Sequence, residues 1–243
     1  MSNVLWIARR ELKAYLRSPL GYVVAAAVLL IDGIWFIAKA MGPAGDKRLS
    51  AAVLSEFFHG ATGTTMIACI ALSMRLIAQE QEQGTLVLLR TSPVRDRDIV
   101  LGKFLSVWLV MLIITALSAY MPALIFVRGR VSVGHILVGY TGVLLLAAAS
   151  TAIGVFASAL ARSQVIAAIL GAVVLGTMVL LWMVARISEP PINAFIEALA
   201  LHHVHQRQFM AGVLRLEHVV YYLAVSFFFL LAAVKTLEVR RWR

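Results

Sequence analysis

The sequence predicts an all-α integral membrane protein with six transmembrane helices. Of its 243 residues, 61% are hydrophobic and only 14% are charged, and the mean hydropathy is +0.89. Soluble domains carry about 25% charged residues, so most of this chain is expected to lie in lipid. Its apolar residues form long runs, each close to the ~20 residues that a helix needs to cross a bilayer. The length allows six spans with short connectors and no large soluble domain.

Polar or helix-breaking residues separate the apolar runs. Gly42-Pro43 lies in the first connector, and only Arg162, Ser163 and Gln164 separate the fourth run from the fifth, which predicts a tight hairpin. We expect a single transmembrane domain over 1–243, with spans at about 20–38, 57–74, 104–127, 136–161, 163–185 and 219–237.

The stretch 4–17 has apolar residues at helical spacing with four basic residues between them. This pattern predicts an amphipathic helix that lies in the membrane interface, with its basic side toward anionic headgroups. Ser18-Pro19 then turns the chain into the bilayer. The apolar run from Leu20 to Ala38 is too long for the core of a signal peptide, so we expect it to remain as the first span.

The orientation follows from the distribution of Lys and Arg over the alternate connectors. With six spans, both termini lie on one side, and that side holds 14 of the 22 basic residues against 8 on the other. The more basic side is predicted to be the cytoplasm of a bacterial inner membrane. Both termini and the connector after the second span are then cytoplasmic.

That connector, 78–103, is charged and contains a short apolar stretch, Gly84 to Leu89. Six helical residues rise only ~9 Å, which is too short to span. Glu80 and Glu82 precede the stretch and Pro93 ends it. We therefore expect a short surface helix that offers its apolar side to another protein chain.

The same region carries a family resemblance, and the rest of the chain adds to it. The pattern resembles ABC-2 type permeases, and most of all the Gld-type branch associated with gliding motility. The resemblance covers nearly the whole chain. It rests on Arg9-Arg10-Glu11-Leu12, Ser18-Pro19, Met74 to Ala78, Glu80, Gly84-Thr85-Leu86, Leu88-Leu89, Thr91, Pro93-Val94, Ile99 to Phe104, Gly154 to Leu160, Phe209 to Tyr222 and Glu238 to Trp242.

The resemblance implies one half of an exporter, in which a cytosolic coupling helix between spans two and three docks on an ABC ATPase. Two ATPase copies, a second identical or related permease, and an auxiliary membrane or periplasmic protein of the Gld type are the implied partners, beside membrane lipids. Relatives often have an acid and an apolar residue where this chain has Val87 and Arg90. The predicted ATPase-coupling residues are Glu80, Glu82, Gly84, Thr85, Leu86, Leu88, Leu89 and Pro93.

The chain is not expected to be an enzyme. A phosphate-binding loop of the form G-x-x-x-x-G-K-[ST] is needed to hold ATP. The single Gly-Lys pair, Gly102-Lys103, is followed by Phe104 and has Arg97 at the position of the first Gly. We therefore expect no cofactor in this chain, and ATP with Mg in the partner ATPase.

Asp32 is an acid inside a predicted span, where a carboxylate costs ~3 kcal/mol or more unless it is hydrated or paired. It either lines the translocation path or forms a structural pair with Lys39, which lies two helical turns away on the same face. The sequence leaves both alternatives open.

Other chemistry-bearing residues favour structural roles. His202 and His205 share a helix face while His203 points elsewhere, and no Cys or well-placed acid completes a metal site, so we expect a water-facing stretch and no metal. Cys69 is alone in an apolar run, which predicts a buried thiol. From Pro190-Pro191 onward the apolar spacing is helix-like, and the segment resembles the short outer helices that ABC-2 permeases have between spans five and six. The resemblance implies that these helices cap the cavity.

Glycines in the fourth and fifth runs permit close helix contact. Their spacing does not match G-x-x-x-G, so packing within the tight hairpin is favoured over a dimer seam. The glycines concerned are Gly139, Gly142, Gly154, Gly171 and Gly176.

Composition and spacing also weigh against other function classes. The net charge of +10 is dispersed at the ends of the apolar runs, so nucleic-acid binding is not expected. A secondary carrier would need more ionisable residues in its spans than Asp32. A membrane anchor or scaffold for a partner complex remains the other alternative to an exporter permease.

Overall fold

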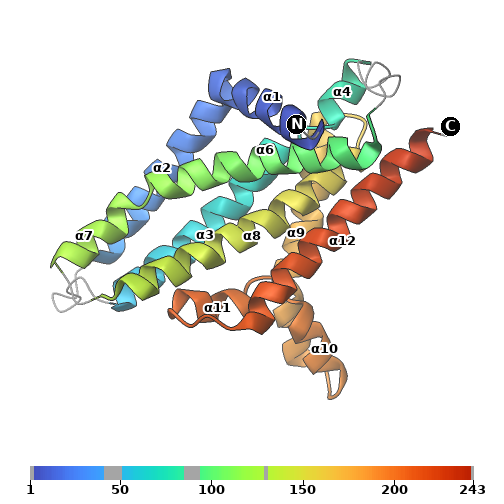
Figure 1. Ribbon diagram of the computed structural model, residues 1–243. Coiled ribbons are helices and arrows are strands. Elements are labelled where there is room, and N and C mark those ends of the chain that lie inside the picture. Colours follow the sequence, from blue (N-terminus) through green and yellow to red (C-terminus); the bar gives the residue numbers. More distant parts are fainter. Residues whose placement is uncertain (1–2, 41–50, 85–93, 129–130, 242–243) are drawn as a thin grey trace.

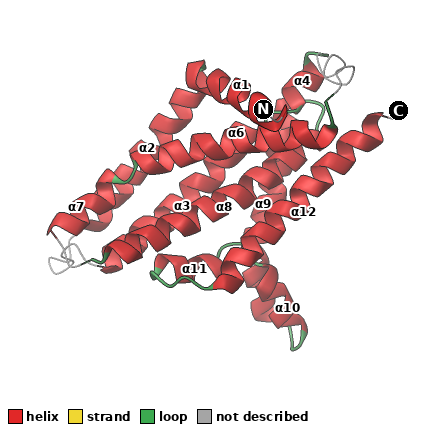
Figure 2. Cartoon of the chain, viewed as in Figure 1, coloured by secondary structure: helices red, strands yellow, loops and turns green. Residues whose placement is uncertain are grey.

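The computed structural model describes residues 3–40, 51–84, 94–128 and 131–241, and this part of the chain contains helices but no strand (Figure 1, Figure 2). The helices are α1 Asn3–Arg17, α2 Pro19–Ala40, α3 Ala51–Ser73, α4 Ala78–Glu82, α6 Asp96–Leu117, α7 Tyr120–Arg128, α8 Val133–Leu160, α9 Gln164–Ile187, α10 Ile192–Leu199, α11 His205–Met210 and α12 Leu216–Arg241.

Six helical segments of the described chain are long and apolar enough to cross a membrane, which confirms the predicted all-α, six-span fold. They are α2, α3 with α4, α6 with α7, α8, α9 and α12. The helices extend beyond the apolar runs. For example, α3 begins at Ala51 rather than near 57 and α6 at Asp96 rather than near 104. Charged residues can continue a helix where its end reaches interfacial water, so apolar runs alone underestimate helix length.

The third span is broken near its far end, between α6 and α7. Pro122 has no backbone N–H to donate to the carbonyl of Ser118, and its ring would crowd that carbonyl. The chain turns there instead, and the Met121 amide bonds the Ser118 carbonyl at 3.1 Å. The sequence predicted one span over about 104–127, and the structure shows a break within it. Pro122 explains the position of that break.

Helix α8 lies at the centre of the bundle, with α3, α6, α9 and α12 packed around it (Figure 1). Its core-facing positions are rich in small residues such as Ala147, Ala152 and Gly154, which are buried. By contrast, only 17% of the most apolar stretch of α2 and of α9 is buried. These two peripheral helices keep broad apolar faces for lipid or another membrane chain.

The glycines of α8 pack within the chain, as predicted, but against different partners. A Cβ at Gly139 would lie 2.1 Å from the Phe58 ring, and one at Gly142 2.4 Å from Phe209 Cβ. These contacts join α8 to α3 and α11 rather than to its hairpin partner α9, because α8 is surrounded on all sides. Gly176 on α9 has no atom within 4 Å of such a Cβ.

Helix α1 lies across the start of α6 at one end of the bundle and beside α4, and α12 ends at the same end of the bundle (Figure 1). We call this end, which holds α1, α4, the start of α6 and the last turns of α12, the basic end. Helix α1 buries Ile7, Ala8 and Tyr15 against the bundle, whereas Leu5 and Trp6 remain exposed. Its second apolar side therefore remains available for the acyl boundary of a membrane interface.

Candidate functional site

The helix of the second span is interrupted between α3 and α4, at residues 74–77, and Ser158 of α8 lies against this break, which we call the corner. Its hydroxyl accepts hydrogen bonds from the amides of Ile77 and Ala78 and donates to the carbonyl of Met74, each at 3.0 Å. The helix break exposes these backbone groups, which must be satisfied when they are buried. Ser158 satisfies them from both sides of the break.

A glycine lets α8 approach closely enough for this contact. Gly154 lies one turn before Ser158, and a Cβ there would sit 1.8 Å from the Ser73 hydroxyl oxygen. Gly154 and Ser158 both belong to the stretch Gly154 to Leu160 on which the family resemblance partly rests. Their spacing therefore serves to seat the α3–α4 corner on α8.

Lys103 lies two turns inside α6 with a side chain only 2% exposed. Its ammonium group is 2.7 Å from Glu80 Oε1 and 3.5 Å from Glu11 Oε1, and it donates to the Leu76 carbonyl. A buried charge is tolerated only when it is paired and hydrogen-bonded. This single cation therefore connects α6 to α1, to α4 and to the corner.

Glu11 and Arg10 of α1 extend the ion pairs to the surface. The Arg10 guanidinium is 2.7 Å from Glu11 Oε1 and 3.9 Å from Glu80 Oε1. Burial raises the pKa of Glu11, but the charges and hydrogen bonds of Lys103 and Arg10 outweigh burial and hold that pKa below its ordinary value. Glu11 is thus an ionised carboxylate at neutral pH.

Tyr15 closes the inner wall of the same region. Its hydroxyl donates to the Leu72 carbonyl at 2.7 Å, and the Arg75 guanidinium lies 4.9 Å from its ring centroid. Burial raises the pKa of Tyr15 well above its ordinary value, so the phenol stays protonated. Together with Gln79 and Gln83 these side chains line an open polar pocket of about 260 Å³ beside Lys103.

The last turns of α12 hold α4 from the opposite side. Arg240 donates to Gln81 Oε1 and to the Leu160 carbonyl, both at 2.6 Å. The Gln164 amide at the start of α9 lies 3.5 Å from Glu82 Oε2. Helix α4, only five residues long, therefore has polar contacts with α1, α6, α8, α9 and α12.

The structure places three of the predicted coupling residues and leaves the others outside its described residues. Glu80 faces inward to Lys103, Glu82 is exposed, and Gly84 has φ +70°, a backbone conformation that favours glycine. Their part in contacting an ATPase stays a prediction. Thr85, Leu86, Leu88, Leu89 and Pro93 lie outside the described residues.

Sequence reasoning missed the role of Lys103, Glu11 and Arg240. It assigned Lys103 to the end of a connector, whereas α6 begins at Asp96. One sequence feature could have indicated the role of Lys103: a long apolar run follows it directly. A cation at the edge of a span must find a partner or reach water. No feature of the sequence marks Glu11 as that partner, since 92 residues separate the two.

Asp32 is buried in α2 and accepts a hydrogen bond from Thr64 of α3 at 2.7 Å. The expected alternative of an Asp32–Lys39 pair is wrong. Lys39 instead pairs with Glu56 at 3.0 Å and lies over the Trp35 ring, because Glu56 lies level with it on the neighbouring helix. A role of Asp32 in the translocation path stays a prediction.

The histidines after α10 are packed among other rings rather than facing water. His202 Nε2 lies 2.9 Å from the Thr62 hydroxyl, His203 stacks on Trp182, and His205 is buried with its Nδ1 2.9 Å from His218 Nδ1. Burial lowers the pKa of His202 to about 4. Within the described residues, no three His, Cys, Asp or Glu side chains are arranged to hold a metal ion.

Comparison with known proteins gives consistent matches. The family described as "ABC-2 family transporter protein" matches residues 5–211. A probable ABC transporter permease protein NosY of Pseudomonas aeruginosa is 35% identical over 118 residues, 47% of this chain and 42% of that protein. Its counterpart in Stutzerimonas stutzeri is 36% identical over 107 residues, 43% and 38% of the two chains. Each match spans less than half of the relative's length, but the family match covers most of this chain, α1 through α11, so the chain belongs to the ABC-2 family of transporter proteins.

Proposed function

We propose that the chain is the transmembrane permease subunit of an ABC exporter, powered by a separate ABC ATPase subunit that binds ATP and Mg. Family membership supports this function, as do the printed names of the two relatives, both permeases. The six apolar helices supply the membrane path.

The observation that carries the proposal is the anchoring of α4 at the basic end. The predicted coupling residues 85–93 follow α4 directly, so a partner that moves them would also move α4. Lys103, Ser158 and Arg240 fix α4 to α6, α8 and α12. Packed helices respond to such a displacement as rigid bodies. A motion produced by ATP would thus reach three spans at once.

The proposal places the basic end, and with it both termini, in the cytosol. Loops rich in Lys and Arg face the cytoplasm, and an ATPase that uses cytosolic ATP must dock there. Two ATPase copies and a second identical or related permease complete the proposed exporter. The exposed faces of α2 and α9 offer apolar surface for that second permease.

The Gld-type branch is the finer assignment that we propose from the sequence pattern, together with an auxiliary membrane or periplasmic protein of that type. The resemblance of Gly84 to Pro93 and of Gly154 to Leu160 supports it. The two relatives are named for another permease, so the branch rests on these motifs alone.

The proposal is tested by changing Leu88 and Leu89 together to Asp and co-expressing the chain with its ABC ATPase subunit. A buried Leu contributes ~2 kcal/mol, and a carboxylate in its place opposes docking. We expect loss of ATPase copurification and of vanadate-sensitive hydrolysis in nanodiscs, with unchanged monodispersity of the permease.

The matched control changes the same two residues to Met, which keeps their apolar character. This variant should retain both ATPase copurification and vanadate-sensitive hydrolysis. Copurification with undiminished hydrolysis in the Asp variant would refute coupling through this segment. An ATPase that binds but hydrolyses ATP at the same rate without the permease would favour the scaffold alternative.

A further inference from the structure

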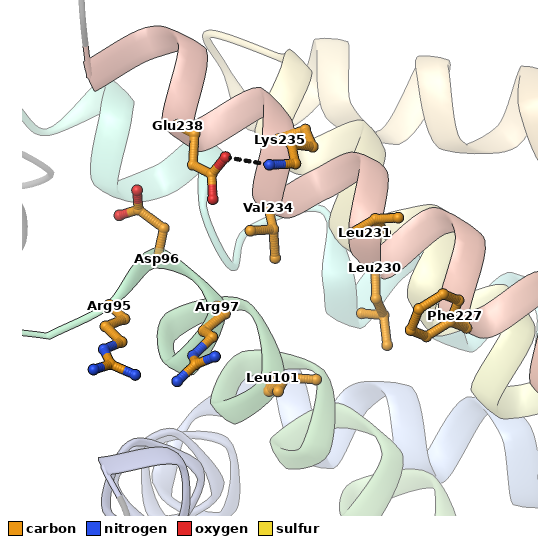
Figure 3. Close-up of a pocket in the computed structure, with 10 residues that line it drawn as sticks. All are labelled: Arg95, Asp96, Arg97, Leu101, Phe227, Leu230, Leu231, Val234, Lys235 and Glu238. Carbon is orange, nitrogen blue, oxygen red and sulfur yellow. Dashed lines mark hydrogen bonds and ion pairs between the residues drawn. The ribbon is translucent and has the colours of Figure 1, made fainter.

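A groove opens at the basic end between the start of α6 and the last turns of α12 (Figure 3). Its volume is about 830 Å³, within the range of small-molecule sites. Apolar side chains form its inner part: Leu101 from α6, with Phe227 and Leu231 from α12. They are 40%, 69% and 46% exposed, so they present an open apolar surface at the edge of the bundle.

The groove has the length of one membrane leaflet. Its lining on α12 runs from Phe227 to Glu238, and these positions are about 16 Å apart along a helix axis. Half of a typical hydrocarbon core is about 15 Å. An acyl chain that enters from the adjacent leaflet can therefore follow the apolar part of this lining on α12, from Val234 to Phe227.

Cationic side chains gather where the groove meets the interface. Figure 3 shows the guanidinium groups of Arg95 and Arg97 side by side at the first turn of α6. Both side chains are exposed. Arg97 lies 3.9 Å from Asp98, and Arg95 forms no ion pair with another described residue. Two adjacent guanidinium groups suit the oxygens of a phosphate.

Two carboxylates also line this rim, so its net charge has to be considered. The Glu238 carboxylate accepts a hydrogen bond from Lys235 at 2.8 Å, which neutralises that pair locally. With Asp96 included, three cationic and two anionic side chains line the groove, and Asp98, beside Arg97, balances the remaining charge. The rim as a whole is therefore close to neutral, and an anion is favoured locally, at the two guanidinium groups on the α6 side, away from Glu238.

We propose that this groove binds an anionic phospholipid from the leaflet at the basic end. Its phosphate lies at Arg95 and Arg97, and one acyl chain runs past Leu101 and Leu231 toward Phe227. Basic pockets between membrane helices on the cytoplasmic side are suited to anionic headgroups. The site is separate from the Lys103 cluster, and its occupation requires no ATPase, so it goes beyond the proposed function.

The test measures binding of phosphatidylglycerol and of phosphatidylcholine with the same acyl chains to the full chain in a neutral detergent, by native mass spectrometry. We expect tighter binding of phosphatidylglycerol. Changing Arg95 and Arg97 together to Gln should weaken that binding about thirty-fold, at about 1 kcal/mol per lost cation. Phosphatidylcholine binding should change little.

A second variant separates the groove from the general charge of the surface. Leu231→Trp fills the apolar part and should weaken both lipids, while circular dichroism shows an intact helix content. The matched control changes Arg9 and Arg162, which are exposed on the same side but do not line the groove, to Gln. We expect it to bind phosphatidylglycerol as the unaltered chain does.

Three outcomes would overturn the proposal. The first is equal binding of the two lipids, and the second is equal weakening by the Arg9 and Arg162 control, which would indicate diffuse electrostatics. The third is a disulfide between two copies carrying Leu231→Cys in native membranes, which would show that another protein chain covers the groove.

Discussion

At the scale of single residues, Lys103 shows how a charge can be kept inside an apolar bundle. Removing one partner of a buried ion pair leaves the other uncompensated, which costs about 3–5 kcal/mol, although replacing the whole set by apolar groups is often neutral. The ammonium has three donors and uses them on Glu80, Glu11 and the Leu76 carbonyl. The value of this residue therefore depends on its partners.

Lys103→Met should lower the stability by about 3–5 kcal/mol because Glu80 loses its close cation, whereas Glu11 keeps Arg10. Adding Glu80→Gln should restore a large part of that loss, since it removes the stranded charge. Thermal unfolding in detergent of the two single variants and the double variant measures the coupling. Lys235→Met, at a side chain 66% exposed, serves as the control and should have little effect. If the stability losses of the two single variants simply added in the double variant, Lys103 and Glu80 would not be energetically coupled.

His202 predicts a pH dependence at the opposite end of the bundle. Its folded pKa of about 4 lies below the unfolded value of about 6.5, so between these values the unfolded state binds more protons. Stability should therefore fall as pH drops from about 6.5 to about 4 and level off below that. Melting curves of the protein and of His202→Asn check this. The variant should lack this loss of stability between about pH 6.5 and about pH 4. The same dependence of stability on pH in both proteins would refute the assignment of the effect to His202.

At the scale of elements, α1 can lie on α6 only because residue 102 has no side chain. A Cβ there would sit 2.7 Å from Ile7 Cβ and 3.0 Å from the Val4 carbonyl oxygen, and the backbone atom cannot move without moving α1. The same contact brings Glu11 near Lys103. The seating of the amphipathic helix and the pairing of the buried cation thus depend on one glycine.

Gly102→Val should lift α1, expose Lys103 and reduce permease-stimulated ATP hydrolysis several-fold, with a loss of stability of about 1–3 kcal/mol from overpacking. Gly176→Val is the matched control, because nothing lies within 4 Å of a Cβ at that position. Protease sensitivity of α1 and the ATPase rate are the measurements. Equal behaviour of the two variants would show that α1 does not need the close contact.

The elements also show what sequence reasoning could and could not reach. Long apolar runs predicted six spans because lipid demands them, and Ser18-Pro19 marks a turn for stereochemical reasons. The break before Pro122 was not predicted, although a proline there disfavours a continuous helix. The start of α6 was missed because Arg95 to Asp98 are as polar as a loop. The Ser158 contact and the Arg240 contact join residues about 80 and 160 positions apart, which no local pattern encodes.

At the scale of the whole molecule, the proposed orientation makes a direct prediction. Arg9 lies at the basic end and Glu197 on α10 at the other, and both are exposed. In intact cells, a membrane-impermeant maleimide should label Glu197→Cys but label Arg9→Cys only after the membrane is opened. The one native thiol, Cys69, is buried and should give no background. Labelling of Arg9→Cys from outside would reverse the topology and separate the basic end from any cytosolic ATPase.

The corner at Ser158 has a mechanical consequence for this architecture. A single hydroxyl bonds the backbone on both sides of the break between α3 and α4, so a continuous helix there would leave the Ser158 hydroxyl buried without these three partners. The Ser158 hydroxyl therefore ties this break to α8. A displacement of α4 would therefore be passed through Ser158 to α8, the central helix of the bundle.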